Sequence, residues 1–149
     1  IKELAYFDGT ASYQLTNAFT EKEKKTKLTP KATDNKSVIL MNNWVGSPNH
    51  NYDGDKITIN DYYSMAFALL CVVTGRARAT YFQVKPWDLA GAWPILKDLG
   101  LEFYGYNTSS PLNEVSPKTF NNNWKPHEVY ICCKKEDFDY LQSVITLRS

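Results

Sequence analysis

The stretch Lys85–Gly100, which reads KPWDLAGAWPILKDLG, decides the fold because it places one carboxylate at the start of an apolar helix. Pro86 fixes its own φ and disfavours a helical conformation at the preceding residue, so a helix is expected to begin here. Asp88 then falls at the N-cap or in the first turn, where it meets the positive end of the helix dipole. Apolar residues follow at helical spacing, and Gly100 is a typical stop. Asp88 is therefore either a helix cap or a ligand for a hard cation.

Short apolar runs alternate with helical patterns along the rest of the chain. This alternation predicts an α/β fold: one layered domain over residues 1–149, with a mixed β-sheet flanked by helices. Strands are expected at 38–41, 79–83, 102–104 and 129–132, and helices at 61–74 and 136–147.

The polar segments are predicted to be connections. Asp8 and Gly9 should form the turn of an N-terminal hairpin with strands at 3–7 and 11–15. The charged run 21–27 is expected to be a solvated loop or a short exposed helix. A long loop is predicted over 42–61, which is rich in Asn, Asp, Gly and Pro.

Charge and cysteine usage exclude several classes of protein. A net charge of +1 gives no electrostatic case for binding nucleic acid or a membrane surface. No apolar run is long enough to span a bilayer. Cys71, Cys132 and Cys133 have no CxxC spacing, so they are interpreted as buried, reduced thiols of a cytoplasmic protein.

Several segments together resemble one family. Trp87–Gly91 reads WDLAG and precedes an apolar helix and a glycine. Upstream lie the apolar helix 63–77, which ends in TGRA, and a strand at 79–83; further back is a strand and turn at 37–47. In this order they resemble the C-terminal half of the inositol monophosphatase family, which comprises Mg²⁺-dependent, Li⁺-sensitive phosphomonoesterases. The resemblance spans most of the chain, and its specific element is the Trp-Asp pair.

The resemblance implies roles for three residues. Asp88 would ligate a Mg²⁺ ion, Ser64 would lie close to the substrate, and Gln83 would contact substrate hydroxyl groups. The family's other metal ligands come from an N-terminal lobe with a Glu-Glu pair and an Asp-Pro-x-Asp-Gly-Thr loop, which this sequence lacks. Phe7–Thr10 imitates that loop, but Ala5 stands where its partner aspartate is expected, so Asp8 is assigned to the hairpin turn.

The resemblance also implies the partners. The substrate would be a small phosphorylated metabolite: an inositol phosphate, a sugar phosphate, histidinol phosphate or a nucleotide 3′-phosphate. Tyr63 and Met65 are bulky where relatives have small residues, which disfavours a polyol. The chain is expected to be inactive without the missing N-terminal lobe, and its exposed surface could form a homodimer. The alternative is a non-catalytic binding or assembly module that keeps the fold without the metal loop.

Overall fold

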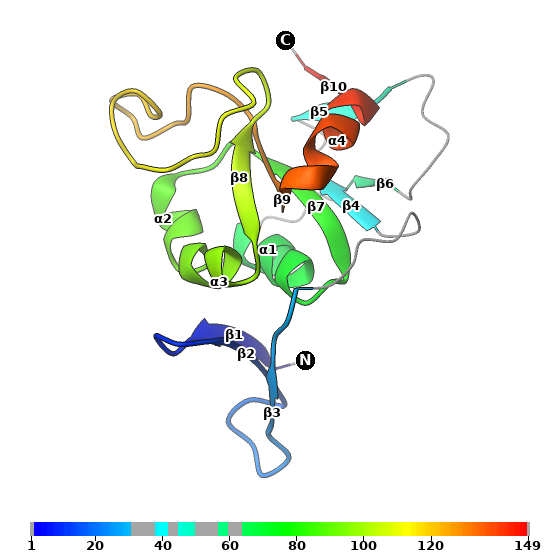
Figure 1. Cartoon of the computed structure of the whole chain (residues 1–149), viewed down its shortest axis with the longest axis vertical. Coiled ribbons are helices and arrows are strands. Elements are labelled where there is room, and N and C mark those ends of the chain that lie inside the picture. Colours follow the sequence, from blue (N-terminus) through cyan, green and yellow to red (C-terminus); the bar gives the residue numbers. More distant parts are fainter. Residues whose placement is uncertain (1, 31–37, 42–44, 50–56, 60–63, 149) are drawn as a thin grey trace.

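A mixed β-sheet forms the centre of the molecule (Figure 1). The computed structural model describes residues 2–30, 38–41, 45–49, 57–59 and 64–148. Within them, the main sheet has the strand order β6-β4-β7-β9-β8. The strands are β4 (Val38–Met41), β6 (Ile57–Ile59), β7 (Ala77–Phe82), β8 (Leu101–Gly105) and β9 (Tyr130–Lys134). Strand β4 pairs in parallel with β6 and β7, whereas β9 pairs antiparallel with β7 and β8. The predicted α/β fold with a mixed sheet is confirmed.

Helices cover both faces of this sheet. Figure 1 shows α1, α2 and α3 on one side and α4 on the other. Their bounds are α1 (Met65–Val73), α2 (Pro86–Ala90), α3 (Trp93–Asp98) and α4 (Phe138–Val144), the last preceded by a 3₁₀ turn, η1 (Lys135–Asp137). Side chains of each strand alternate between the two faces, so that Phe82 and Cys132 join the core under α1–α3, while Tyr81 and Cys133 join the core under α4.

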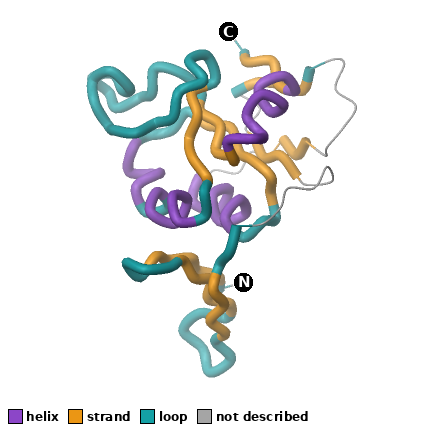
Figure 2. The backbone as a smooth tube through the Cα atoms, in the orientation of Figure 1, coloured by secondary structure: helices purple, strands orange, loops and turns teal. Residues whose placement is uncertain are grey.

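A second, antiparallel sheet lies at one end of the molecule (Figure 2). It contains β1 (Glu3–Phe7), β2 (Ser12–Thr16) and β3 (Lys24–Lys27) in that order. Asp8 Oδ1 accepts hydrogen bonds from both the backbone N–H and the hydroxyl of Thr10 and from the Ala11 N–H. These bonds, the Thr10 hydroxyl foremost, lower the pKa of Asp8. The predicted hairpin is confirmed, with its second strand starting one residue later.

This hairpin sheet is attached to the main core. Ala5 and Phe7 pack against the core under α1–α3. The backbone N–H of Ser12 donates to Asp98 Oδ2 at 2.8 Å, which joins β2 to the end of α3. Leu28, just after β3, is buried in the same core. The assignment of residues 1–149 to one domain stays a prediction.

Three expectations about elements were wrong. Residues 24–27 form the edge strand β3, because pairing with β2 satisfies backbone groups whatever the lysine side chains prefer. The predicted loop 42–61 contains β6 and also β5 (Gly46–Pro48), which pairs with β10 (Ile145–Leu147). The closing helix therefore ends at Val144, where β-branched Ile145 and Thr146 enter a strand.

The two apolar helices also differ from expectation. The helix expected after Pro86 is split into α2 and α3, because Pro94 cannot continue a hydrogen-bonded ladder and restarts a helix in its first turn. The helix predicted at 61–74 corresponds to α1, in which Ala66 and Phe67 of the first turn are exposed while Leu69, Val72 and Val73 are buried. The first three residues of the predicted helix, 61–63, lie outside the described residues; Asp61 is the cap that the sequence suggests for it.

The three cysteines are free and buried, as the sequence predicts. Burial raises the pKa of all three thiols, most strongly those of Cys132 and Cys133. Among the described residues, no helix has both the length and the apolarity needed to cross a membrane.

Breaking the buried ion pair between Arg78 of β7 and Asp137 by removing one charge is predicted to destabilise the fold strongly. Arg78 Nη2 lies 2.7 Å from Asp137 Oδ1, and their side chains are only 9% and 5% exposed. Asp137→Asn replaces the buried carboxylate that pairs with Arg78 by a neutral amide and should lower the free energy of unfolding by about 3–5 kcal/mol. Urea denaturation measures the loss. The control is Glu102→Gln, which removes the exposed Lys97–Glu102 pair and should cost less than about 1 kcal/mol. Equal losses in the two variants would contradict the prediction.

Candidate functional site

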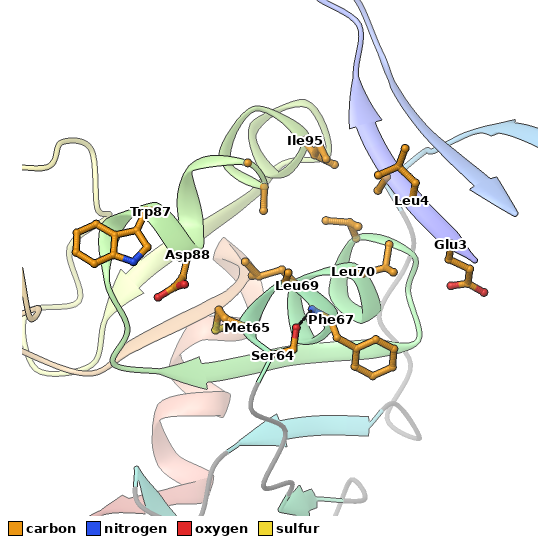
Figure 3. Close-up of a pocket in the computed structure, with 15 residues that line it drawn as sticks. Glu3, Leu4, Ser64, Met65, Phe67, Leu69, Leu70, Trp87, Asp88 and Ile95 are labelled. Carbon is orange, nitrogen blue, oxygen red and sulfur yellow. Dashed lines mark hydrogen bonds between the residues drawn. The ribbon is translucent and has the colours of Figure 1, made fainter. Parts of the chain in front are cut away.

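A pocket of about 660 Å³ lies between β1 and the helices α1, α2 and α3 (Figure 3). Its middle is apolar, with Leu69 and Leu70 of α1 facing Ile95 of α3. The polar residues Ser64 and Asp88 lie at one end. This combination of an apolar wall and a few polar groups is typical of a small-molecule site.

Asp88 is exposed in the first turn of α2. Its Oδ2 accepts a hydrogen bond of 3.2 Å from the backbone N–H of Lys85, the N-cap residue. The other carboxylate oxygen has no hydrogen-bond partner among the described residues. Asp88 therefore caps its helix with one oxygen and leaves the second free for a ligand.

Ser64 is the N-cap of α1 and is likewise exposed. Its Oγ accepts from the backbone N–H of Phe67 at 3.3 Å, as expected for an N-cap serine. Because this bond uses only the oxygen, the hydroxyl hydrogen can still donate to a ligand. Figure 3 shows Ser64, Met65 and Asp88 at the same end of the pocket.

The topology explains why Ser64 and Asp88 line the same pocket. Strands β6, β4 and β7 are mutually parallel. Ser64 follows β6 in the chain and Asp88 follows β7. Both residues thus come after the carboxyl ends of parallel strands, the edge where ligands bind in open α/β sheets.

Gln83 is placed differently. It follows β7, is half-buried, and its Nε2 donates to the backbone oxygen of Pro126 at 3.3 Å. Gln83 does not line the pocket, as far as the described residues show. Its contact with a substrate stays a prediction.

Sequence reasoning missed the surroundings of Asp88. Trp87 lines the pocket with a side chain that is 61% exposed. The Lys85 Nζ lies 5.5 Å from the centroid of the Trp87 ring and donates to the backbone oxygen of Asn123. No sequence signal predicts a contact to a backbone carbonyl so far along the chain. At the other end of the pocket, Glu3 forms a 2.7 Å ion pair with Arg76.

The described residues fit a Mg²⁺ ion only in part. Among them, no group of three or more His, Cys, Asp or Glu side chains is placed to hold a metal ion. Asp88 offers a hard oxygen ligand of the kind that Mg²⁺ prefers, but a single carboxylate holds such an ion weakly. A complete site at Asp88 would need ligands from outside these residues.

Comparison with known proteins supports the fold. No family model and no curated protein matches the sequence. A staphylococcal IMPase-I complexed with products matches with a TM-score of 0.57 and 14% identity, over 89% of this chain and 49% of that chain. An IMPase/NADP phosphatase complexed with Mg²⁺ and phosphate matches with a TM-score of 0.57 and 15% identity, over 89% of this chain and 49% of that chain. A 2′AMP-bound SaIMPase-II matches with a TM-score of 0.53 and 19% identity, over 92% of this chain and 58% of that chain. The chain thus shares its fold with part of these solved structures. It spans about half the length of each of them.

Substitutions of Asp88 are predicted to separate its structural role from its charge. Asp88→Asn keeps an oxygen acceptor for the Lys85 N–H, so the free energy of unfolding should fall by less than about 0.5 kcal/mol. Asp88→Ala removes the acceptor and should cost about 1 kcal/mol. Urea denaturation of both variants measures the difference. A larger loss for Asn than for Ala would show that the carboxylate does not cap α2.

Proposed function

We propose that the chain forms one lobe of a Mg²⁺-dependent phosphomonoesterase of the inositol monophosphatase type. Asp88 would contribute one metal ligand, and Ser64 would contact the substrate. One observation carries the proposal: the free carboxylate oxygen of Asp88 and the hydroxyl of Ser64 share one end of a pocket in a phosphatase fold.

The chemistry of the residues is consistent with this role. A bound Mg²⁺ supplies positive charge that offsets the reacting phosphoryl group and the leaving oxygen. Asp88 would hold the ion through its free oxygen. Ser64 would donate its hydroxyl hydrogen to a substrate oxygen while its own oxygen remains bonded to Phe67 N–H. The apolar wall around Leu69 and Ile95 would limit access of bulk water.

The substrate in this proposal is a small phosphorylated metabolite. Solved structures with the same fold are bound to D-inositol-1-phosphate, 2′AMP and NADP. In this chain Met65 is half-buried in the pocket lining beside Ser64, which narrows the space for a polyol. Sugar and nucleotide phosphates are therefore as good candidates as inositol phosphates.

The complete site would require a second lobe that carries the remaining metal ligands. Leu4, Phe67 and Trp87 line the pocket with exposed side chains, which is typical of a surface that another polypeptide covers. Without that lobe, we expect this surface to favour a homodimer. The buried free cysteines are consistent with a reducing compartment such as the cytoplasm.

The same exposed surface favours a second candidate, a non-catalytic binding or assembly module. In that case Asp88 would serve only as a helix cap. The two candidates differ in whether a divalent cation binds at Asp88.

A Mn²⁺ titration of the ¹⁵N-labelled chain tests the metal site. Paramagnetic Mn²⁺ should broaden the amide resonances around Asp88 and Ser64 first, with millimolar affinity because only one carboxylate contributes. Asp88→Asn should abolish this local broadening. The matched control is Asp139→Asn, which neutralises an exposed aspartate in the first turn of α4 and should leave the broadening at Asp88 unchanged. Broadening that survives Asp88→Asn would refute the assignment.

Hydrolysis of p-nitrophenyl phosphate tests the need for a second lobe. The chain alone, in saturating Mg²⁺, should show no measurable turnover. Joined to a lobe that carries the Glu-Glu pair and the Asp-Pro-x-Asp-Gly-Thr loop, it should become active, and Asp88→Asn should then reduce kcat by orders of magnitude. Wild-type turnover in that variant would exclude Asp88 as a ligand.

A further inference from the structure

Lys85 and Asp88 are neighbours, but they are joined through the backbone of Lys85 and not through its ammonium group. The Lys85 N–H donates to the Asp88 carboxylate. The Lys85 Nζ points elsewhere: it donates to the backbone oxygen of Asn123, 38 residues further along the chain, and lies near the Trp87 ring. Among the described residues, Asp88 has no ion-pair partner.

Lys85 is the extended N-cap residue of α2, and Asp88 is the third residue of that helix. A lysine side chain is long and flexible, and its positive charge attracts a carboxylate three residues away in the chain. The carboxylate already lies against the backbone of Lys85, well within reach of its flexible side chain. The Lys85 ammonium group is instead bonded to the Asn123 carbonyl.

The Asn123 carbonyl is held in place by the side chain of Asn121. Asn121 Oδ1 accepts from the backbone N–H groups of Asn123 at 2.9 Å and of Lys125 at 3.0 Å. The backbone oxygen of Asn121 accepts a hydrogen bond from the Trp124 N–H. The backbone N–H of Asn121 donates to the backbone oxygen of Lys125. Phe120, next to this turn, is buried in the main core. The turn at 121–125 is thus a fixed acceptor for Lys85.

We propose that the turn at 121–125 keeps Lys85 away from Asp88 so that the carboxylate stays available to a divalent cation. A lysine ammonium on Asp88 would occupy the free oxygen and repel an incoming cation. Asn121 is then a positioning residue that acts through Lys85. This inference rests on the proposed role of Asp88 as a metal ligand.

A double-variant cycle tests the proposal, with Mn²⁺ affinity at Asp88 measured by NMR line broadening of the whole chain. Asn121→Ala should release Lys85 onto Asp88 and weaken Mn²⁺ binding about two- to five-fold, the range of an exposed ion pair. Lys85→Met alone should bind Mn²⁺ at least as tightly as the wild type. Adding Lys85→Met to Asn121→Ala should restore the affinity. Asn123→Ala is the control, because the Asn123 groups that take part are all in the backbone.

If Lys85→Met restores Mn²⁺ affinity in the Asn121→Ala background, Asn121 acts by holding the Lys85 charge and not only by supporting the turn at 121–125. If Lys85→Met binds Mn²⁺ more weakly than the wild type, or if the double variant stays as weak as Asn121→Ala, the proposal is wrong. Should Asn121→Ala fail to fold, the contacts of the Lys85 side chain in the wild type decide whether the lysine is held at the turn.

A readout without metal keeps this proposal separable from the proposed function. Nuclear Overhauser contacts between the Lys85 side chain and the backbone at 123–124 should be present in the wild type and Asn123→Ala, and lost in Asn121→Ala. If these contacts are as expected but wild-type Mn²⁺ binding does not depend on Asp88, the proposed function fails and the availability of Asp88 to metal fails with it. If the contacts are absent from the wild type, the diversion itself is refuted.

Discussion

The burial of β7 on both faces is the constraint on which the rest of the structure depends. Ala79 and Tyr81 face the core under α4, while Phe82 faces the core under α1–α3. A strand buried in this way must have its backbone groups paired on both edges, and β4 and β9 supply those partners. The position of its last residue is therefore fixed by two ladders and two cores. Asp88 follows only six residues later, so the position of this exposed carboxylate depends on the buried central strand of the sheet.

Helix α1 transmits the same constraint to Ser64. Leu69 is almost completely buried, and Val72 and Val73 are buried with it, so the helix cannot rotate without opening the core. Its first turn, by contrast, is exposed and faces the pocket. Both polar residues of the candidate site, Ser64 and Asp88, thus lie at the exposed starts of helices that bury other residues in the core. Such support is what positions a ligand group precisely.

The sequence predicts those parts of the fold in which local pattern and burial agree. The apolar runs around Ile39, Tyr81 and Ile131 form strands as expected, because a strand covered on both faces needs no alternation. Strand β3 was missed because its four residues, KKTK, owe their conformation to pairing with β2 and not to their own preferences. The meeting of Ser64 and Asp88 was anticipated only through a family resemblance. The Lys85–Asn123 contact had no precursor in the sequence, since its acceptor is a backbone carbonyl that any residue could provide.

The electrostatics of the pocket are consistent with a half-site. A single carboxylate cannot neutralise a divalent cation, and Glu3, at the far end of the pocket, already pairs with Arg76. The turn at 121–125 holds the Lys85 ammonium group, so that within the described part of the chain Asp88 presents its negative charge without an ion-pair partner. Uncompensated charge is tolerated there because water solvates it; it would be costly in the interior. On the proposed function, the cation would neutralise the charge of Asp88. The second lobe would supply the further ligands that make binding of the cation tight. On the proposed function, metal binding and docking of the second lobe would then be one coupled equilibrium.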